Sequence, residues 1–121
     1  MSALAPPAGA LYKICPRQSW SEALERGALP ISRDDLRDGY VHLSAAHQVR
    51  GSLDKHFAGQ TQLVLLVVPS GGLPADALRW EPSRGGELFP HLYAELRREF
   101  VSQVIELTRD ADGRQLLPLE F

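Results

Sequence analysis

Residues 63–68 form the longest apolar run of the chain, Leu-Val-Leu-Leu-Val-Val, and Pro69 closes it. This run is far too short to cross a membrane as a helix, which takes about 20 apolar residues. Because it lacks the alternation of a half-buried strand, it predicts a central β-strand that is covered on both faces. The rest of the chain must supply the strands beside it and the elements that cover it.

Length and composition indicate one globular domain. The chain has 121 residues, 44% of them hydrophobic, and its 13 basic and 15 acidic residues give a net charge of −2. No basic run stands out, so we expect no duplex nucleic acid as a partner. Cys15 has no disulfide partner and residues 1–10 do not resemble a signal peptide, so we expect a cytoplasmic protein without membrane association. We assign residues 1–10 to a loose tail and residues 11–121 to a single domain.

Periodicity and turn signals predict an α+β fold with mostly antiparallel strands and two main helices in the N-terminal half. The first helix is expected to begin at Ser19, as its N-cap, and to end at Gly27. The second is expected to run from about Ala45 to Phe57, with an apolar stripe along one side. The other predicted segments are a connection with one helical turn at 28–38, strands at 11–15, 39–43, 63–68, 78–81 and 89–93, and a hairpin of 100–108 with 114–119.

His42 and Ser44 form the first candidate site. In a strand they project to the same side as Tyr40, while Val41 and Leu43 face the core. Ser44 also fits the N-cap of the following helix, whose first N–H groups suit a phosphate. The alternative is structural, with a half-buried His bonded to the backbone and a Ser that only caps the helix.

His91 and Tyr93 form the second candidate site, because they share one face of a predicted strand. Both side chains donate and accept hydrogen bonds, and the Tyr ring adds a stacking surface. Trp80 and Glu81 are adjacent and point to opposite faces, so we expect Trp80 in the core and Glu81 as the available carboxylate. The structural alternative makes His91 a satisfied core group and Tyr93 an ordinary rim aromatic.

Other site chemistries find little support in the sequence. None of the four His residues has the spacing of a metal-ligand pair, and the single Cys lies in no ligand motif. A set of His42, His91 and Glu81 would bind a metal only if the fold brought them together, so we assign no metal site. The chain also lacks a Gly-x-Ser-x-Gly elbow and a phosphate-binding glycine loop.

The chain resembles a small bacterial family known as domain of unknown function 952. The resemblance covers about residues 11–107 and departs at Ala94, where a Gly is expected after the Tyr. It implies a shared fold, and the family has no established reaction. The residues that carry it are Tyr12-Lys13-Ile14, Trp20, Ala23, Asp38-Gly39-Tyr40-Val41-His42-Leu43-Ser44, Gln48, Phe57, Trp80-Glu81 and Pro90-His91-Leu92-Tyr93.

A second resemblance is to the ADP-ribosyltransferase superfamily, and within it to the RNA 2′-phosphotransferases. Those enzymes carry a passage similar to residues 41–44, followed by a helix and an apolar strand like 63–68. The resemblance implies a split β-sandwich that holds a nicotinamide dinucleotide in a central cleft. Lys13 stands where those enzymes keep a His, and a Lys there offers a point charge for a phosphate.

The second resemblance, together with the co-facial pairs His42–Ser44 and His91–Tyr93, leads us to expect a domain that binds NAD, ADP-ribose or another nucleotide. If it is catalytic, the implied reaction is transfer or hydrolysis at the C1′ of ADP-ribose, with Glu81 stabilising an oxocarbenium-like centre. The alternatives are a non-catalytic interaction module and a metal-dependent hydrolase. The residues assigned to the ligand are Lys13, His42, Ser44, Gln48, His91 and Tyr93.

Overall fold

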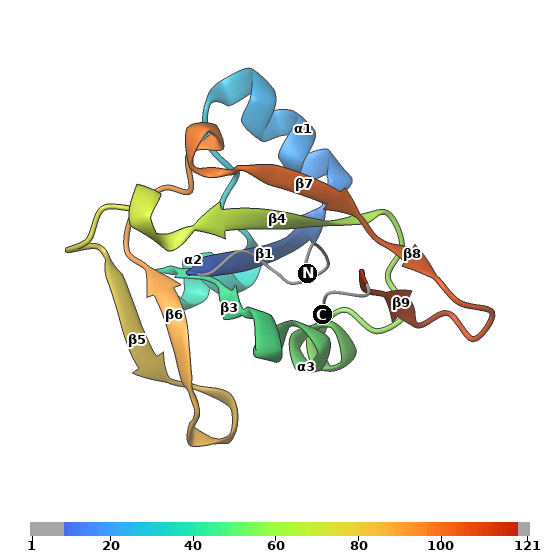
Figure 1. Cartoon of the computed structure of the whole chain (residues 1–121). Helices are drawn as coiled ribbons and strands as arrows, with labels where there is room; N and C mark the ends of the chain where they lie inside the picture. Colours follow the sequence, from blue (N-terminus) through green and yellow to red (C-terminus); the bar gives the residue numbers. More distant parts are fainter. Residues whose placement is uncertain (1–8, 119–121) are drawn as a thin grey trace, which may run out of the picture.

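The apolar run forms β4 (Leu63–Pro69), an inner strand of a four-stranded sheet. A computed structural model describes residues 9–118 of the chain. In it β4 pairs antiparallel with β1 (Ala10–Pro16) on one side and with β7 (Gln103–Glu106) on the other (Figure 1). All six residues of the run are buried, which confirms the prediction of a strand covered on both faces.

The strands of residues 9–118 form three antiparallel sheets, in the orders β3-β1-β4-β7, β2-β6-β5 and β8-β9. The α+β class with mostly antiparallel strands is therefore confirmed. The other elements are α1 (Arg17–Arg26), α2 (Arg33–Asp38), β2 (Val41–His42), β3 (Ser44–Ala45), α3 (Ala46–His56), β5 (Leu78–Pro82), β6 (Leu88–Leu92), β8 (Thr108–Arg109), β9 (Gln115–Leu116) and short 3-10 helices at Ser70–Gly72, Arg84–Gly86 and Arg98–Phe100.

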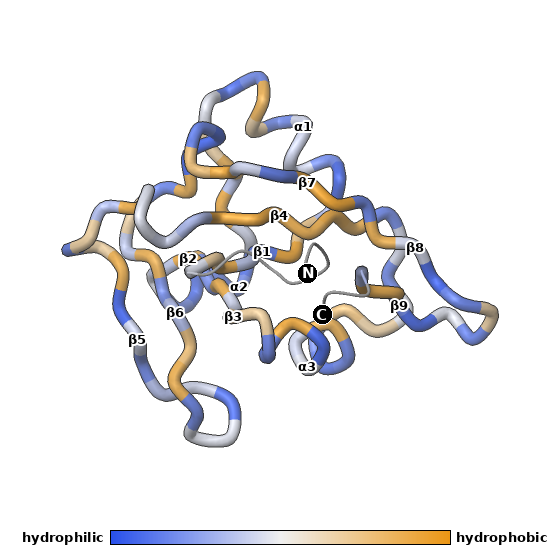
Figure 2. The backbone as a smooth tube through the Cα atoms, in the orientation of Figure 1, coloured by the Kyte–Doolittle hydropathy of each residue, from blue (hydrophilic) through white to orange (hydrophobic). Residues whose placement is uncertain are grey.

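Two apolar clusters cover the two faces of the four-stranded sheet. Val49 and Leu53 of α3 pack on one face, against Leu65 and other residues of β1 and β4. On the other face, Ala23 of α1 and Leu92 of β6 contribute to the second cluster. Figure 2 shows the apolar backbone concentrated along β1 and β4, between these layers. The predicted apolar stripe of the second main helix is thus confirmed as the face buried on the sheet.

The segment predicted as one strand at 39–43 is instead a crossing between the two larger sheets. β2 pairs with β6, whereas β3, only one residue further on, pairs with β1. Leu43 lies between them, with its side chain in the core and its N–H donating to the Pro90 carbonyl at 3.1 Å. The side chains still alternate as predicted, because Val41 and Leu43 are both buried in the same cluster.

The predicted N-caps of the two main helices are wrong. Helix α1 begins at Arg17 rather than after Ser19, because Pro16 presets the helix entry and the Arg17 N–H donates to the Gln62 carbonyl at 2.8 Å. Helix α3 has Ala45 at its N-cap position, and the Ala45 N–H donates to Gln48 Oε1 at 2.9 Å. Ser44 pairs in β3 and does not cap the helix.

Two further predictions are wrong, and a third concerns residues that lie mostly outside the described part of the chain. The structure places Trp80 47% exposed rather than in the core, because β5 is an edge strand. The C-terminal hairpin is confined to β8 and β9, since β7 pairs with β4. Of the predicted tail, residues 1–8 lie outside the described residues, as do 119–121 at the other end, while Ala10 already belongs to β1.

The core packing predicts a difference between two Leu→Ala substitutions in helices. Leu53 in α3 is fully buried, whereas Leu24 in α1 is 50% exposed. We expect Leu53→Ala to lower the free energy of unfolding by about 2–5 kcal/mol, and Leu24→Ala by about 1 kcal/mol or less. Urea denaturation of both variants measures the difference, and equal losses would contradict the assigned layer of α3.

Candidate functional site

A cleft of about 550 Å³ opens where the two larger sheets separate. Its walls come from β1, α2, the 41–45 crossing, α3 and the turn between β5 and β6. Most of its polar lining belongs to side chains that are distant in the sequence. They include Lys13, His42, Ser44, Ser52, Arg84 and His91.

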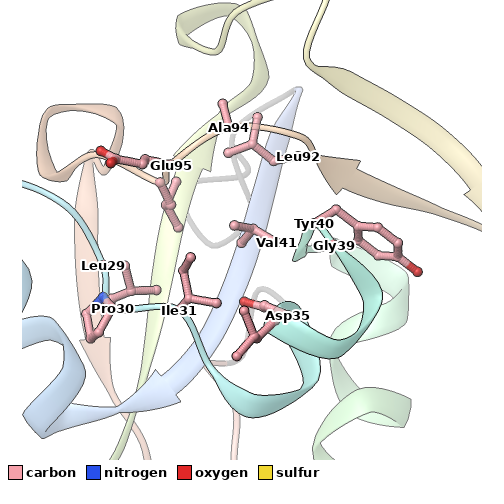
Figure 3. Close-up of a pocket in the computed structure, with 12 residues that line it drawn as sticks. Leu29, Pro30, Ile31, Asp35, Gly39, Tyr40, Val41, Leu92, Ala94 and Glu95 are labelled. Carbon is pink, nitrogen blue, oxygen red and sulfur yellow. The ribbon is translucent and has the colours of Figure 1, made fainter.

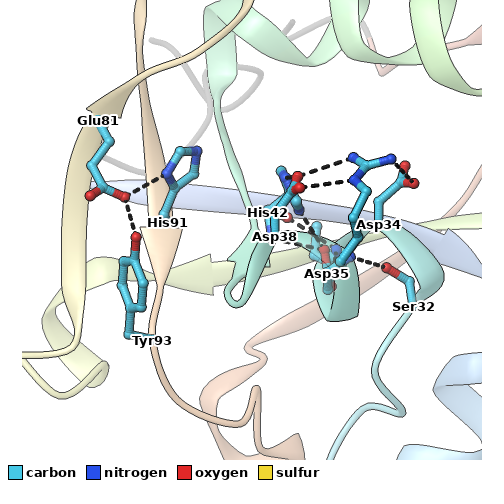
Figure 4. A network of polar contacts seen from close by, with 10 residues as sticks. Ser32, Asp34, Asp35, Asp38, His42, Glu81, His91 and Tyr93 are labelled. Carbon is cyan, nitrogen blue, oxygen red and sulfur yellow. Dashed lines mark hydrogen bonds and ion pairs between the residues drawn. The ribbon is translucent and has the colours of Figure 1, made fainter.

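His42 is held by two carboxylates of helix α2. Its Nδ1 lies 2.6 Å from Asp35 Oδ1, and its Nε2 lies 2.9 Å from Asp38 Oδ2 (Figure 4). Because carboxylates only accept hydrogen bonds, the imidazolium with a hydrogen on both nitrogens satisfies both contacts. The backbone N–H of His42 also donates to Asp35 Oδ1, at 3.2 Å.

Asp35 joins this histidine to the first strand. Its Oδ2 accepts a hydrogen bond of 2.9 Å from Lys13 Nζ, and both side chains are more than nine-tenths buried. Lys13 Nζ also donates to the His42 carbonyl at 3.1 Å. The Lys13 ammonium is thus engaged by Asp35 and His42, so contact with a phosphate would require it to share or exchange these partners.

Local sequence signals place Asp35 at this point. Ser32 is the N-cap of α2, and its side chain accepts the Asp35 N–H at 3.2 Å. An acidic residue in the first helical turn is favoured by the helix dipole. Gly39 ends the helix with φ 87, a conformation that costs Gly little. The chain then reverses direction. His42 therefore contacts the carboxylate of Asp35, which lies seven residues earlier in the sequence.

Two opposing effects act on the pKa of Asp35. Burial favours the neutral acid, but the hydrogen bonds from His42 and the charge and hydrogen bond of Lys13 outweigh it, so the pKa lies below its ordinary value of 3.8. For Asp38, the hydrogen bond from Arg37 is the largest effect and lowers the pKa to about 2. Both carboxylates beside His42 are therefore ionised at neutral pH.

His91 is held by a different carboxylate, on the neighbouring strand. Its Nδ1 donates to Glu81 Oε1 at 2.8 Å, and the same oxygen accepts the Tyr93 hydroxyl at 2.7 Å. These two bonds, from Tyr93 first and His91 second, lower the pKa of Glu81. Figure 4 shows the second ring nitrogen of His91 directed away from Glu81.

The Nε2 of His91 is a buried polar atom that finds no hydrogen-bond partner within residues 9–118. The residue is only 2% exposed, yet it lines the cleft. In the neutral ring with hydrogen on Nδ1, Nε2 is an acceptor. Leaving such a group unpaired costs about 1–3 kcal/mol, so a bound hydroxyl or N–H would be favoured at this nitrogen.

The two histidines belong to one aromatic cluster. His42 pairs with His91 in the register of β2 and β6, and their ring centroids are 5.7 Å apart. The Tyr40 ring stacks on His91 with centroids 3.9 Å apart and lies 5.3 Å from Tyr93. The rings contact one another, and His42 and His91 are the two of them that line the cleft.

The structure brings some of the predicted ligand residues together and separates others. Lys13, His42, Ser44 and His91 line the cleft. The remaining three predicted residues, Gln48, Glu81 and Tyr93, are not part of its lining. Gln48 is buried and donates to the Leu88 carbonyl at 2.8 Å, which ties α3 to β6.

Sequence reasoning missed Asp35, Asp38 and Arg84. The first two lie in a segment that was predicted to be mostly connection. The pattern Ser32-x-x-Asp35 is a helix-start signal that could have placed α2 and its carboxylates. Arg84 lies in a Gly-rich turn between two strands, where no local pattern indicates a role.

A second, smaller cavity of about 210 Å³ lies on the other side of α2 (Figure 3). Its lining is mostly apolar and includes Ile31, Leu36, Tyr40 and Leu92. Asp35 touches both cavities, so α2 forms the partition between them. Because convergent polar groups mark ligand sites, we take the larger cleft as the candidate site.

Thiol and metal chemistry find little basis in the described residues. Cys15 lines the cleft, but burial raises the pKa of its thiol to about 11, so the thiol is protonated at neutral pH. Among residues 9–118, no three His, Cys, Asp or Glu side chains are placed to hold a metal ion.

Within residues 9–118, no helix is long and apolar enough to span a membrane.

The family model described as Protein of unknown function (DUF952) matches residues 14–104. The chain belongs to this family, which confirms the resemblance inferred from its residues.

The solved structures most similar to this chain include those of protein CC0527 from Caulobacter crescentus. Its crystal structure is 44% identical with a TM-score of 0.84, covering 89% of this chain and 94% of that one. A crystal structure of a double mutant gives 42% identity over the same shares, with a TM-score of 0.84. The solution NMR structure gives 44% identity and a TM-score of 0.78, covering 87% and 90%. The search of curated proteins found no match.

The buried ion pair predicts a large effect of Asp35→Asn on stability. The variant leaves the Lys13 charge buried without its counter-charge, so we expect the free energy of unfolding at pH 7 to fall by about 3–5 kcal/mol. Asp34→Asn is the matched control, because Asp34 is exposed and its ion pair within residues 9–118 is a surface pair with Arg37. Its effect is expected to be within about 1 kcal/mol, and urea denaturation measures both.

The difference in stability between wild type and Asp35→Asn is also expected to depend on pH. Because the pKa of Asp35 is lower in the folded chain than its ordinary value of 3.8, the folded state binds fewer protons. The stabilisation by Asp35 is therefore complete only well above 3.8, the ordinary pKa, and is lost as the pH falls from there through the lower folded pKa. A difference that stays constant down to pH 2 would contradict this role.

Proposed function

We propose that this domain binds NAD, ADP-ribose or a related nucleotide in the cleft between its two larger sheets. The observation that carries the proposal is the pair His42 and His91. They lie in register on adjacent strands, line one cleft, and are each oriented by a carboxylate from another element.

The architecture supports a fold like that of the ADP-ribosyltransferases. The chain has a four-stranded and a three-stranded antiparallel sheet, and it crosses from one to the other between β2 and β3. The cleft opens at this crossing, where a split β-sandwich would hold a nicotinamide dinucleotide. Its volume of about 550 Å³ lies within the usual range of ligand pockets, about 300–1,000 Å³.

The chemistry of the two histidines suits a polar, hydroxyl-bearing ligand. The unpaired Nε2 of His91 would accept a hydrogen bond from a ribose hydroxyl. His42 contacts Asp35 and Asp38 through both ring nitrogens, so it shapes the wall beside the ligand. Lys13 lies in the same wall, paired with Asp35.

The contacts of Glu81 support an orienting role. Its Oε1 is shared by His91 and Tyr93, and the residue is not among those that line the cleft. We therefore propose that Glu81 acts through His91, fixing the tautomer that leaves Nε2 as the acceptor. Direct stabilisation of a charged sugar by Glu81 would require the ligand to reach behind the His91 ring.

The proposal predicts that His91 is needed for binding. We expect ADP-ribose and NAD to bind the wild-type protein, and His91→Ala to weaken this binding at least tenfold, which corresponds to about 1.4 kcal/mol. Isothermal titration calorimetry measures the affinity, and NMR spectra verify that the variant is folded.

The matched control is His47→Ala. His47 is exposed and contacts Glu87 at 2.6 Å, and it does not line the cleft. Its removal is expected to leave the affinity unchanged. The absence of binding to folded wild-type protein at millimolar nucleotide would overturn the proposal and favour a non-catalytic interaction module.

A further inference from the structure

Arg84 lines the cleft with a guanidinium that forms no ion pair with a carboxylate of residues 9–118, and its charge reaches Glu87 only at longer range. It lies in the turn between β5 and β6, is partly buried, and lines the cleft. No carboxylate within residues 9–118 forms an ion pair with its guanidinium; the side-chain oxygen that it contacts is the hydroxyl of Ser52. A fixed guanidinium of this kind is suited to an anionic ligand.

Three neighbours fix the position of this guanidinium. Its Nη1 donates to Ser52 Oγ at 3.3 Å, and its central carbon lies 4.8 Å from the centroid of the Phe89 ring. Gly51 in the middle of α3 permits the close approach, because a Cβ there would lie only 2.9 Å from Arg84 Nη2. Gly is unfavourable inside a helix by about 1 kcal/mol relative to Ala, and at this position it leaves space for the arginine.

Two buried hydroxyls continue the polar surface from Arg84. Ser52 Oγ lies 3.2 Å from Ser44 Oγ, and both residues line the cleft. Because Ser52 accepts a hydrogen bond from Arg84, it can donate its own hydrogen to Ser44. Ser44 is then free to donate its hydroxyl hydrogen to a ligand.

The unpaired Nε2 of His91 is an independent sign of a ligand in this cleft. It is a buried nitrogen without a hydrogen-bond partner among the described residues, and its ring lies in the same lining as Arg84 and Ser44. A phosphate presents both charged oxygens for a guanidinium and, when it is esterified to a sugar, neighbouring hydroxyls for an acceptor.

We infer that Arg84, Ser52 and Ser44 form a subsite for a phosphate or pyrophosphate group. This inference rests on the proposed function for the identity of the rest of the ligand, and it deepens that function by placing the anionic part. Arg84 forms the charged contact and Ser44 supplies a neutral donor. His91 lies beside this subsite and receives a hydroxyl of the attached sugar.

The test uses the full chain and two probes, inorganic pyrophosphate and ADP-ribose, titrated by calorimetry. Arg84→Gln removes the charge and is expected to weaken the binding of both probes at least tenfold. Arg84→Lys keeps the charge without the planar fork and is expected to give an intermediate loss. NMR spectra of each variant report whether it is folded. If Arg84→Gln does not fold, the affinity of Arg84→Lys decides the result.

The matched control is Arg79→Gln, which makes the same change of charge. Arg79 is an exposed residue of β5 whose guanidinium lies 5.2 Å from the Tyr93 ring centroid, and it does not line the cleft. We expect the affinity of the Arg79→Gln variant for both probes to stay within twofold of the wild-type affinity. An equal loss in both Gln variants would indicate only nonspecific charge attraction and would overturn the subsite.

The two proposals fail in different ways. If ADP-ribose binds wild type and Arg84→Gln equally well, the subsite is wrong and nucleotide binding stands. If pyrophosphate binding depends on Arg84 but ADP-ribose does not bind, the subsite stands and nucleotide binding is wrong. If neither probe binds the folded wild-type protein at millimolar concentration, both proposals are overturned.

Discussion

The geometry of the cleft depends on the hydrogen bonds and the ion pair of the Asp35 carboxylate. This carboxylate accepts hydrogen bonds from Lys13 Nζ, His42 Nδ1 and the His42 N–H, and thus joins β1, α2 and the crossing between the sheets. A buried ion pair adds little net stability compared with apolar packing, since desolvation offsets its attraction. Its consequence here is positional, because one carboxylate links α2 both to β1 and to the crossing, which strand pairing joins to each other but not to α2.

The two histidines share a principle but differ in what they leave available. Each is oriented by a carboxylate outside its own strand, Asp35 for His42 and Glu81 for His91. His42 uses both ring nitrogens within the protein, whereas His91 leaves Nε2 unpaired among the described residues. The first therefore stabilises the wall of the cleft, and the second is the ring that can interact with a ligand.

The sequence allowed the core to be predicted much better than the site. The run 63–68 and the apolar stripe of α3 are local patterns, and burial follows directly from them. The helical turn predicted within 28–38 is confirmed as α2, but its six residues, Arg-Asp-Asp-Leu-Arg-Asp, carry almost no apolar periodicity, so nothing indicated that its carboxylates face a cleft. Arg84 could not be found at all, since its guanidinium is positioned by a contact with Ser52, more than 30 residues away in the chain.

The crossing at 41–45 explains why the alternating apolar and polar residues of this segment line a cleft instead of forming one continuous strand. Val41 and Leu43 are anchored in the core, so their neighbours must project to the opposite side. Because the chain changes sheets at Leu43, the His42 ring contacts α2 and the Ser44 hydroxyl contacts Ser52 of α3. The two polar groups thus line different walls of one cleft. If the strand continued in one sheet, both side chains would project from the same face, so the cleft depends on the change of sheet at Leu43.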